Sequence, residues 1–170
     1  TVNGVCSVEF RVQDPRGTGV ATVVASIGVG TSTVFQRSLQ IHMASGPYSV
    51  LNFAGTALLN SIALTSCKET FQARLQDRNG GSTAAGTVIS ADLTSSDLRA
   101  SIKSGSPVPD QLAAGFPPTV FGFEIDATAL TSAACDPTGT KVGQAFLNIG
   151  WTSPSGVRGT QRIDITYPTK

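Results

Sequence analysis

Two carboxylates are the residues of this sequence with the clearest potential for chemistry. Glu124 and Asp126 are separated by one residue in an alternating apolar segment, so their side chains share one face of a predicted strand. Glycoside hydrolysis needs only two Asp or Glu side chains on facing elements, and Glu9 lies in a second segment of similar pattern. The ordinary alternative is the polar outer face of an antiparallel strand. We favour that alternative over a hydrolase.

Other residues typical of enzyme sites are scarce. His42 is the only histidine, and its place next to Ile41 in an alternating segment predicts that it faces outward. The sequence contains no G-x-S-x-G elbow, P-loop, dinucleotide fingerprint or EF-hand loop. Its three cysteines do not have the spacing of a zinc site. We therefore expect a protein that is not an enzyme and that uses no metal or cofactor.

Aromatic residues could instead bind a ligand, because the apolar face of a sugar stacks on an exposed ring. Trp151 ends a predicted strand, and Tyr48 follows a Ser-Gly-Pro turn. The proline-rich stretch at residues 105–119 could form the rim of a site or cross between two sheets. The ordinary alternatives are a core position for Trp151 and a turn-flanking position for Tyr48. The candidate ligand-binding residues are Trp151, Tyr48, Pro107, Pro109 and Phe116.

Strands are the elements that would position these residues. Inward apolar residues alternate with polar ones in four segments, Val8–Val12, Phe71–Leu75, Phe121–Ile125 and Ile163–Tyr167. Further strands are predicted at residues 20–29, 33–43, 48–53, 58–64, 85–93 and 144–151. Turn motifs separate them at residues 14–17, 77–81 and 136–139, and the Asn-Gly pair of the second motif is typical of a hairpin.

Helical signals are limited to one or two short turns, at residues 95–103 and 110–115. Many short strands with Gly- and Pro-containing turns are typical of a sandwich or barrel. The sequence thus predicts one all-β domain over residues 1–170. Its expected architecture is an antiparallel two-sheet β-sandwich or jelly roll of about ten strands.

The composition limits the kinds of binding partner and the cellular location that we expect. The chain has 12 Lys and Arg against 11 Asp and Glu, and only 14% of its residues are charged, which argues against nucleic acid as a ligand. No apolar run approaches the length of a membrane span. The first residues lack the features of a signal peptide, as expected of a mature chain. We expect a secreted, cell-surface or virion-surface protein.

The three cysteines can form at most one internal disulfide. The predicted bridge joins Cys6 to Cys67. The alternative is a reduced protein in which all three thiols pack as small apolar residues. The third cysteine, Cys135, would be free if the predicted bridge forms.

The overall pattern resembles that of chaperone–usher pilins. An early cysteine lies in an alternating strand, a second cysteine follows, the chain is rich in Ser, Thr and Ala, and the last strand carries Tyr167 near its end. The sequence departs from that pattern in the long spacing from Cys6 to Cys67, in the additional Cys135 and in the three residues after Tyr167. The segment before Cys6 is also short for a donor strand. The resemblance implies a β-sandwich subunit that assembles with its own copies.

Low charge also favours association, because natural monomers usually protect exposed strand edges with Lys or other charges. The chain has only four lysines. We therefore expect a structural or adhesive protein outside the cytoplasm that acts by self-association, through contacts at its terminal strands. The alternative is a monomeric module that binds a surface glycan or protein, and a glycoside hydrolase is the third possibility.

Overall fold

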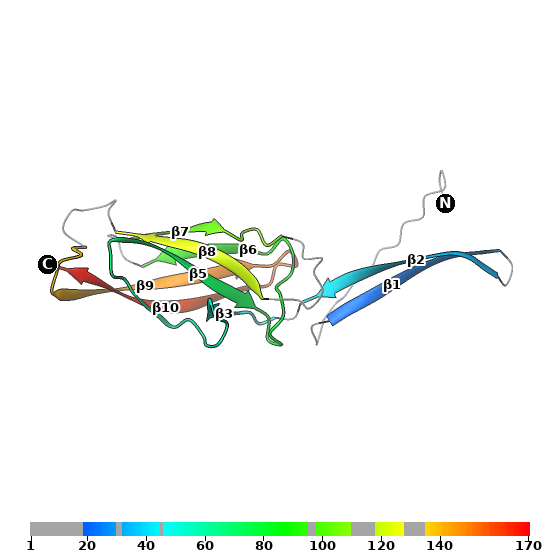
Figure 1. Cartoon of the computed structure of the whole chain (residues 1–170), viewed down its shortest axis with the longest axis horizontal. Helices are drawn as coiled ribbons and strands as arrows, with labels where there is room; N and C mark the ends of the chain where they lie inside the picture. The colour runs from blue at the N-terminus through cyan, green and yellow to red at the C-terminus, as the bar shows by residue number, and fades with distance from the viewer. Residues whose placement is uncertain (1–18, 30–31, 45, 95–97, 110–117, 128–134) are drawn as a thin grey trace.

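The computed structural model describes residues 19–29, 32–44, 46–94, 98–109, 118–127 and 135–170 (Figure 1). These ranges contain ten strands and no helix. The predicted all-β class and number of strands are therefore confirmed. The strands are β1 (Gly19–Val29), β2 (Ser32–Met43), β3 (Ser49–Asn52), β4 (Ser61–Ala63), β5 (Lys68–Gln76), β6 (Val88–Leu93), β7 (Arg99–Ser104), β8 (Thr119–Asp126), β9 (Lys141–Thr152) and β10 (Arg158–Thr169).

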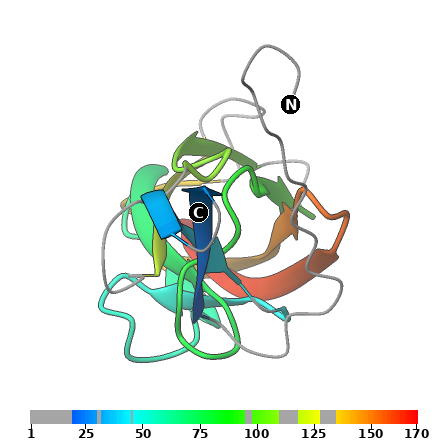
Figure 2. The same ribbon diagram turned by 90° about the vertical axis from the view of Figure 1, so that its right-hand side faces the viewer.

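Eight strands form a sandwich of two four-stranded sheets. One sheet has the order β3-β5-β8-β7 and is antiparallel throughout. The other has the order β4-β10-β9-β6, and it is antiparallel except for the short parallel pair of β4 and β10. Figure 2 shows the strands of both sheets around a common centre, with the remaining pair, β1 and β2, pointing toward the viewer.

The core lies between the two sheets, and three of the predicted alternating segments supply much of it. Phe121, Phe123 and Ile125 of β8 are fully buried, as is Ile163 of β10. The polar residues between them face outward, so the period-two prediction holds for these strands. The fourth predicted segment, Val8–Val12, lies outside the described residues.

Two glycines of the β9–β10 ladder lie beneath aromatic rings of the opposite strand. Gly159 pairs with Trp151, and Gly143 pairs with Tyr167. A Cβ added at Gly159 would lie 2.5 Å from Trp151 Cζ2, and one added at Gly143 would lie 2.5 Å from Tyr167 Cζ. Each glycine thus provides the space in which its partner ring packs.

The Gln161 side chain links the two sheets near the strand ends. The Gln161 amide on β10 accepts a hydrogen bond from the Val50 N–H at 2.8 Å and donates to the Val50 carbonyl at 2.9 Å. It also donates to the Leu59 carbonyl at 3.0 Å. The Gln161 amide therefore supplies hydrogen-bond partners to backbone groups of β3 and of the segment after it. A neighbouring strand would otherwise supply such partners.

Two local predictions are wrong. Residues 99–103 belong to β7 rather than to a helical turn, because pairing with β8 satisfies their backbone and places Ala100 and Ile102 toward the core. The Ser-Ser-Asp sequence before Leu98 indicates the start of a helix, but a strand buries Ala100 and Ile102 equally well. The other predicted helical turn, at residues 110–115, lies outside the described residues.

The second correction concerns connections. The turn at Asp77 forms as predicted, since its carboxylate accepts hydrogen bonds from the Asn79 and Gly81 amides. It does not close a hairpin, however, because β5 and the following β6 lie in opposite sheets. Conversely, the proline-rich stretch 105–119 connects β7 and β8, which belong to the same sheet. Its described residues Ser106 and Val108 form hydrogen bonds with Ile89 of β6 and with Thr87, at the edge of the other sheet.

Candidate functional site

The feature with the clearest potential for interaction is the β1–β2 hairpin. Its strands pair with each other in a separate two-stranded sheet, which extends from the end of the sandwich (Figure 1). An isolated two-stranded hairpin is only marginally stable in water. A hairpin of this kind therefore depends on packing against something else.

The register of the hairpin separates its residues into two unlike faces, because residues directly opposite each other in an antiparallel pair share a face. Val23 pairs with Leu39, and Ile27 pairs with Phe35. What we call the apolar face consists of Ala21, Val23, Ala25, Ile27, Phe35, Arg37, Leu39 and Met43. The opposite, polar face consists of Thr22, Val24, Ser26, Gln36, Ser38 and Gln40.

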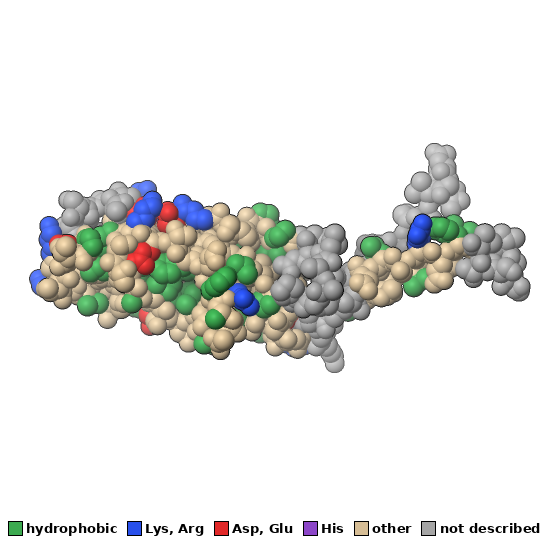
Figure 3. Space-filling model, in the orientation of Figure 1, with side chains coloured by type: hydrophobic (Ala, Val, Ile, Leu, Met, Phe, Trp, Pro, Cys, Tyr) green, Lys and Arg blue, Asp and Glu red, His purple; other side chains and the backbone are tan. Residues whose placement is uncertain are grey.

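The apolar face is open to solvent. Leu39 is 64% exposed, Ile27 63% and Phe35 47%. Burying side chains of this size usually yields about 1.5–3 kcal/mol each, and this face leaves much of that unrealised. In Figure 3 green apolar side chains lie on the projecting hairpin beside one basic group. Exposed apolar surface of this kind usually marks a contact with another molecule or segment.

Arg37 is the only Lys or Arg on the hairpin, and it lies on the apolar face. Its guanidinium carbon is 5.0 Å from the centre of the Phe35 ring, within the range of a cation–π contact. The aliphatic stem of an arginine can cover apolar surface while its head group stays hydrated. Arg37 therefore adds one charge to the apolar face, while its aliphatic stem keeps the face continuous.

A second, smaller group of exposed apolar side chains lies on the outer face of the β3-β5-β8-β7 sheet. Phe53, Leu58 and Val120 are 51%, 53% and 44% exposed. Arg74 lies in the same row, since it pairs with Val120, and its guanidinium carbon is 5.6 Å from the Phe53 ring centre. Figure 3 shows apolar side chains next to a basic one over β3 and β5. We call these four residues the sandwich patch.

The structure overturns the predicted aromatic platforms. Tyr48 and Trp151 are only 8% and 7% exposed, and their ring centres are 6.3 Å apart with a tilt of 45°. Burial raises the pKa of the Tyr48 phenol. Both rings pack in the core at the end of the sandwich, so neither presents a face to a sugar.

The remaining predicted ligand-binding residues are only partly described. Pro107 and Pro109 are exposed on either side of the buried Val108, whose backbone pairs with that of Gly86 and Thr87. Phe116 lies outside the described residues. The role of these residues in binding stays a prediction.

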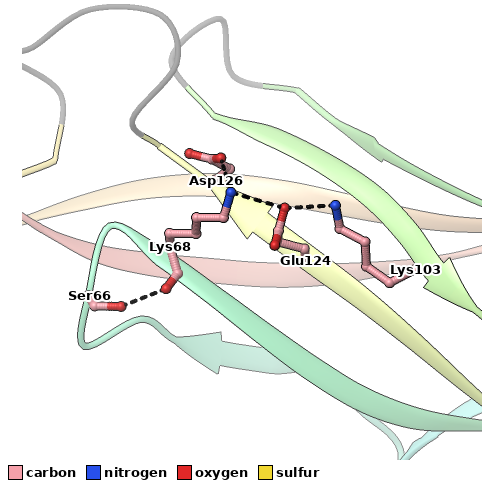
Figure 4. A network of polar contacts seen from close by, with 5 residues as sticks. All are labelled: Ser66, Lys68, Lys103, Glu124 and Asp126. Carbon is pink, nitrogen blue, oxygen red and sulfur yellow. Dashed lines mark hydrogen bonds and ion pairs between the residues drawn. The ribbon is translucent and has the colours of Figure 1, made fainter.

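Glu124 and Asp126 form an ion-pair network on the outer face of the sandwich (Figure 4). Lys68 Nζ lies 2.9 Å from Asp126 Oδ2 and 3.4 Å from Glu124 Oε1. Lys103 Nζ lies 2.9 Å from the same Glu124 oxygen. The hydrogen bond from Lys103 lowers the pKa of Glu124, whereas the general acid of a glycosidase needs a raised pKa. These contacts favour the polar outer face of a strand.

The disulfide differs from the predicted one. Cys67 is bonded to Cys135, with a Cα–Cα distance of 5.6 Å, so the predicted Cys6–Cys67 bridge is wrong. Cys67 precedes β5 and Cys135 precedes β9, and both pack against the core. Cys6 lies outside the described residues. Sequence spacing could not select the pair, because the partners are 68 residues apart and meet only through the fold.

Two further features, a metal-binding cluster and a membrane-spanning helix, are absent from the described part of the chain. No three His, Cys, Asp or Glu side chains there are grouped to hold a metal ion. None of its segments forms a helix that is long and apolar enough to cross a membrane.

Comparisons with known proteins do not assign the chain to a family. No family profile matches the sequence, and no curated protein matches it either. One solved structure is similar, described as the S-layer protein SbsC domains 4 and 5, with a TM-score of 0.35 and 12% identity. The match covers 87% of this chain and 57% of that one, so this chain spans little more than half its length. At that TM-score no function is transferred.

The sequence pattern of these two strands does not mark the exposed hairpin as a site. The two strands were predicted at residues 20–29 and 33–43, and their alternation was visible in Phe35, Leu39 and Met43. The same alternation is expected of a strand that faces the core. Only the arrangement of the strands in space distinguishes a buried apolar face from an open one.

Proposed function

We propose that this protein is a structural subunit outside the cytoplasm whose copies associate, with the apolar face of the β1–β2 hairpin as the main contact. The observation that carries the proposal is the exposure of Ile27, Phe35 and Leu39 on a two-stranded sheet that, among the described residues, is separate from both sheets of the sandwich. Such a sheet lacks the second layer that strands need to bury an apolar face.

The disulfide supports the compartment. Disulfides persist in oxidising environments and are rare in the cytosol of most cells. The Cys67–Cys135 bridge therefore supports a secreted or surface location. The low charge of the chain, 14% of residues, adds support for association because little electrostatic repulsion opposes contact between copies.

The alternative is a monomeric module whose hairpin binds a different protein. The same apolar face would favour that function, whereas Trp151 and Tyr48, the two rings predicted to stack on a sugar, are buried. A hydrolase is the least supported function, since Glu124 and Asp126 are both held by lysines.

The test is the native mass measured by light scattering after size exclusion, over a hundredfold range of protein concentration. We expect the mass to rise with concentration in the natural sequence and to stay at that of one chain, 17.5 kDa, in Leu39→Asp. Gln40→Asp is the matched control, because it adds the same charge one residue away on the polar face.

Fluorescence of the single tryptophan, Trp151, would establish that the sandwich is folded in each variant. A natural chain that stays monomeric at every concentration would refute self-association. A monomer that captures a different protein through the hairpin would support the alternative.

A further inference from the structure

We propose that the sandwich patch binds a carboxylate, the side chain of an Asp or Glu that lies between apolar residues on a partner protein. Arg74 supplies the positive charge, and Phe53, Leu58 and Val120 supply the apolar contact. This inference goes beyond the proposed function, because it concerns a different surface and does not require copies to associate through the hairpin.

Arg74 is a partly buried cation that has no acid beside it. Its Nε is buried and, among the described residues, has no hydrogen-bond partner. The ion pairs of those residues involve Lys68, Lys103 and Arg162, and none includes Arg74. A charged group that has lost part of its hydration without gaining a counter-charge attracts an anion more strongly than a fully hydrated one does. The two Nη groups are not enclosed in the same way, so a partner can reach them.

The Arg74 guanidinium is held in place by the turn that follows β3. Its Nη1 would lie 3.1 Å from a Cβ added at Gly55, so the glycine provides the space that this group occupies. The turn itself is fixed by hydrogen bonds. The Gly55 N–H donates to the Asn52 carbonyl at 2.9 Å, and the Thr56 N–H donates to the Asn52 side-chain oxygen at 3.0 Å. A cation that is already ordered loses little further freedom when a partner binds.

A second arginine of the sandwich shows what a complete arrangement contains. The Arg162 guanidinium carbon lies 3.4 Å from the Phe146 ring centre, and Arg162 Nε lies 3.3 Å from Asp164 Oδ1. Arg162 therefore contacts both a ring and a carboxylate, whereas Arg74 contacts only the Phe53 ring. A carboxylate from another molecule would give Arg74 the ion pair that Asp164 gives Arg162.

The surroundings of Arg74 favour a carboxylate over a phosphate. A phosphate group carries up to two charges and three acceptor oxygens, so it is usually held by several donors. Lys68 and Lys103, two other cations on this face of the sheet, are already paired with Glu124. One guanidinium beside apolar side chains therefore suits a single negative charge with apolar neighbours.

The position of the patch favours a protein as the partner. Phe53, Leu58 and Val120 are about half exposed, on the open outer face of the β3-β5-β8-β7 sheet (Figure 3). Small molecules usually bind in clefts that enclose most of their surface. Arginine and aromatic residues are instead enriched at interfaces between proteins.

The experiment is a titration of the isotope-labelled full chain with a blocked peptide, acetyl-Ala-Phe-Glu-Leu-Ala-amide, followed by NMR. A second peptide has Gln in place of Glu, and a third has Ser in place of Phe and Leu. The protein variants are Arg74→Gln and, as the matched control, Arg162→Gln, which removes an arginine that already has its own carboxylate. The amide spectrum of each variant establishes that it is folded.

We expect the Glu peptide to bind with a dissociation constant on the order of 1 mM or tighter, because one ion pair with a few apolar contacts makes a small interface. Replacing Glu by Gln in the peptide, or Arg74 by Gln in the protein, should weaken binding at least about tenfold, since each removes one member of the ion pair. The Ser peptide should bind at least about threefold more weakly because it lacks the apolar contacts. Arg162→Gln should change the affinity less than about twofold, as expected of an independent site. The largest shifts should occur at the amides of Phe53 and Val120 and at the Arg74 Nε–H.

Several outcomes would overturn the inference. Equal affinity for the Glu and Gln peptides, or an unchanged affinity in Arg74→Gln, would mean that the charge plays no part. Absence of binding by the Glu peptide up to about 10 mM would also overturn it. If phenylpropionate, a small acid with the same two chemical groups, binds as tightly as the peptide, the patch is a small-molecule site and a protein partner is refuted.

These outcomes leave the proposed function standing, because the native mass and the Leu39→Asp variant report on the hairpin alone. A native mass that falls when the Glu peptide is added, but not when the Gln peptide is added, would support the inference and identify a second copy as the partner.

Discussion

Gly159→Ala tests whether the close contact between a glycine and an indole ring holds one end of the sandwich. A Cβ at Gly159 would lie 2.5 Å from Trp151 Cζ2 and 2.6 Å from Cε2, distances that real Cβ atoms do not tolerate. The ring is rigid and only 7% exposed, so it must move as a whole. Any movement also disturbs its contact with Tyr48.

The expected loss in the free energy of unfolding follows from the buried area of the Trp151 ring. An aromatic side chain of this kind buries about 200 Å², which corresponds to about 5 kcal/mol at 25 cal/mol per Å². Exposing about a third of it costs roughly 1.5 kcal/mol, and residual overpacking typically adds about 1 kcal/mol. We expect the free energy of unfolding to fall by about 2 kcal/mol, and the melting temperature to fall by about 4–8 °C.

Gly150→Ala is the matched control in the same sheet. A Cβ there would meet the Ser90 hydroxyl at 2.7 Å, and a hydroxyl can rotate away at little cost. We expect this variant to lie within about 0.5 kcal/mol of the natural sequence. Guanidinium denaturation, followed by the fluorescence of the single tryptophan, reports directly on the ring.

Gly159→Ala should also shift the fluorescence emission of Trp151 in the folded protein to longer wavelength. If Gly159→Ala proves as stable as Gly150→Ala, the ring does not depend on the glycine and the reasoning is refuted. A double-mutant cycle with Trp151→Leu, followed by circular dichroism, should reduce the cost of Gly159→Ala by more than half.

Three further predictions concern contacts between distant parts of the chain. Replacing Cys67 and Cys135 together by Ser should lower the free energy of unfolding by up to about 4 kcal/mol, the chain-entropy value for a loop of 68 residues, and reductant should have no further effect on this variant in thermal melts. Gln161→Leu should cost about 1–3 kcal/mol in denaturant titrations because it leaves the Val50 N–H without its acceptor, whereas the Val50 carbonyl keeps its hydrogen bond from the Leu59 N–H. A cost below about 0.5 kcal/mol would contradict this. Because the folded-state pKa of Glu124 is lowered from 4.5, its contribution to stability is complete above about pH 5 and is lost as the pH falls below that. Glu124→Gln should therefore make the free energy of unfolding depend less on pH on the acid side. An unchanged pH dependence would mean that these ion pairs do not contribute to stability.

Local periodicity predicted most of the strands. Segments such as Phe121–Ile125 and Ile163–Tyr167 alternate so regularly that only a strand with one buried face accommodates them, and both are buried as expected. The turn at Asp77 was also predictable, since an aspartate accepts hydrogen bonds from amides within a few residues of itself. β7 was missed because the Ser-Ser-Asp sequence before Leu98 is typical of a helix start, whereas the pairing with β8 that makes residues 99–104 a strand is not visible in the local sequence.

The composition and spacing of this sequence by themselves determined that the protein is all-β, with low charge and no recognisable catalytic motif. These properties depend on neighbouring residues and on averages over the chain. Tertiary structure alone decided that Cys67 pairs with Cys135, that Trp151 and Tyr48 lie in the core, and that the apolar face of β1 and β2 remains open. Each of these depends on which distant segments meet, and an alternating strand carries the same pattern whether its apolar face finds a partner sheet or not.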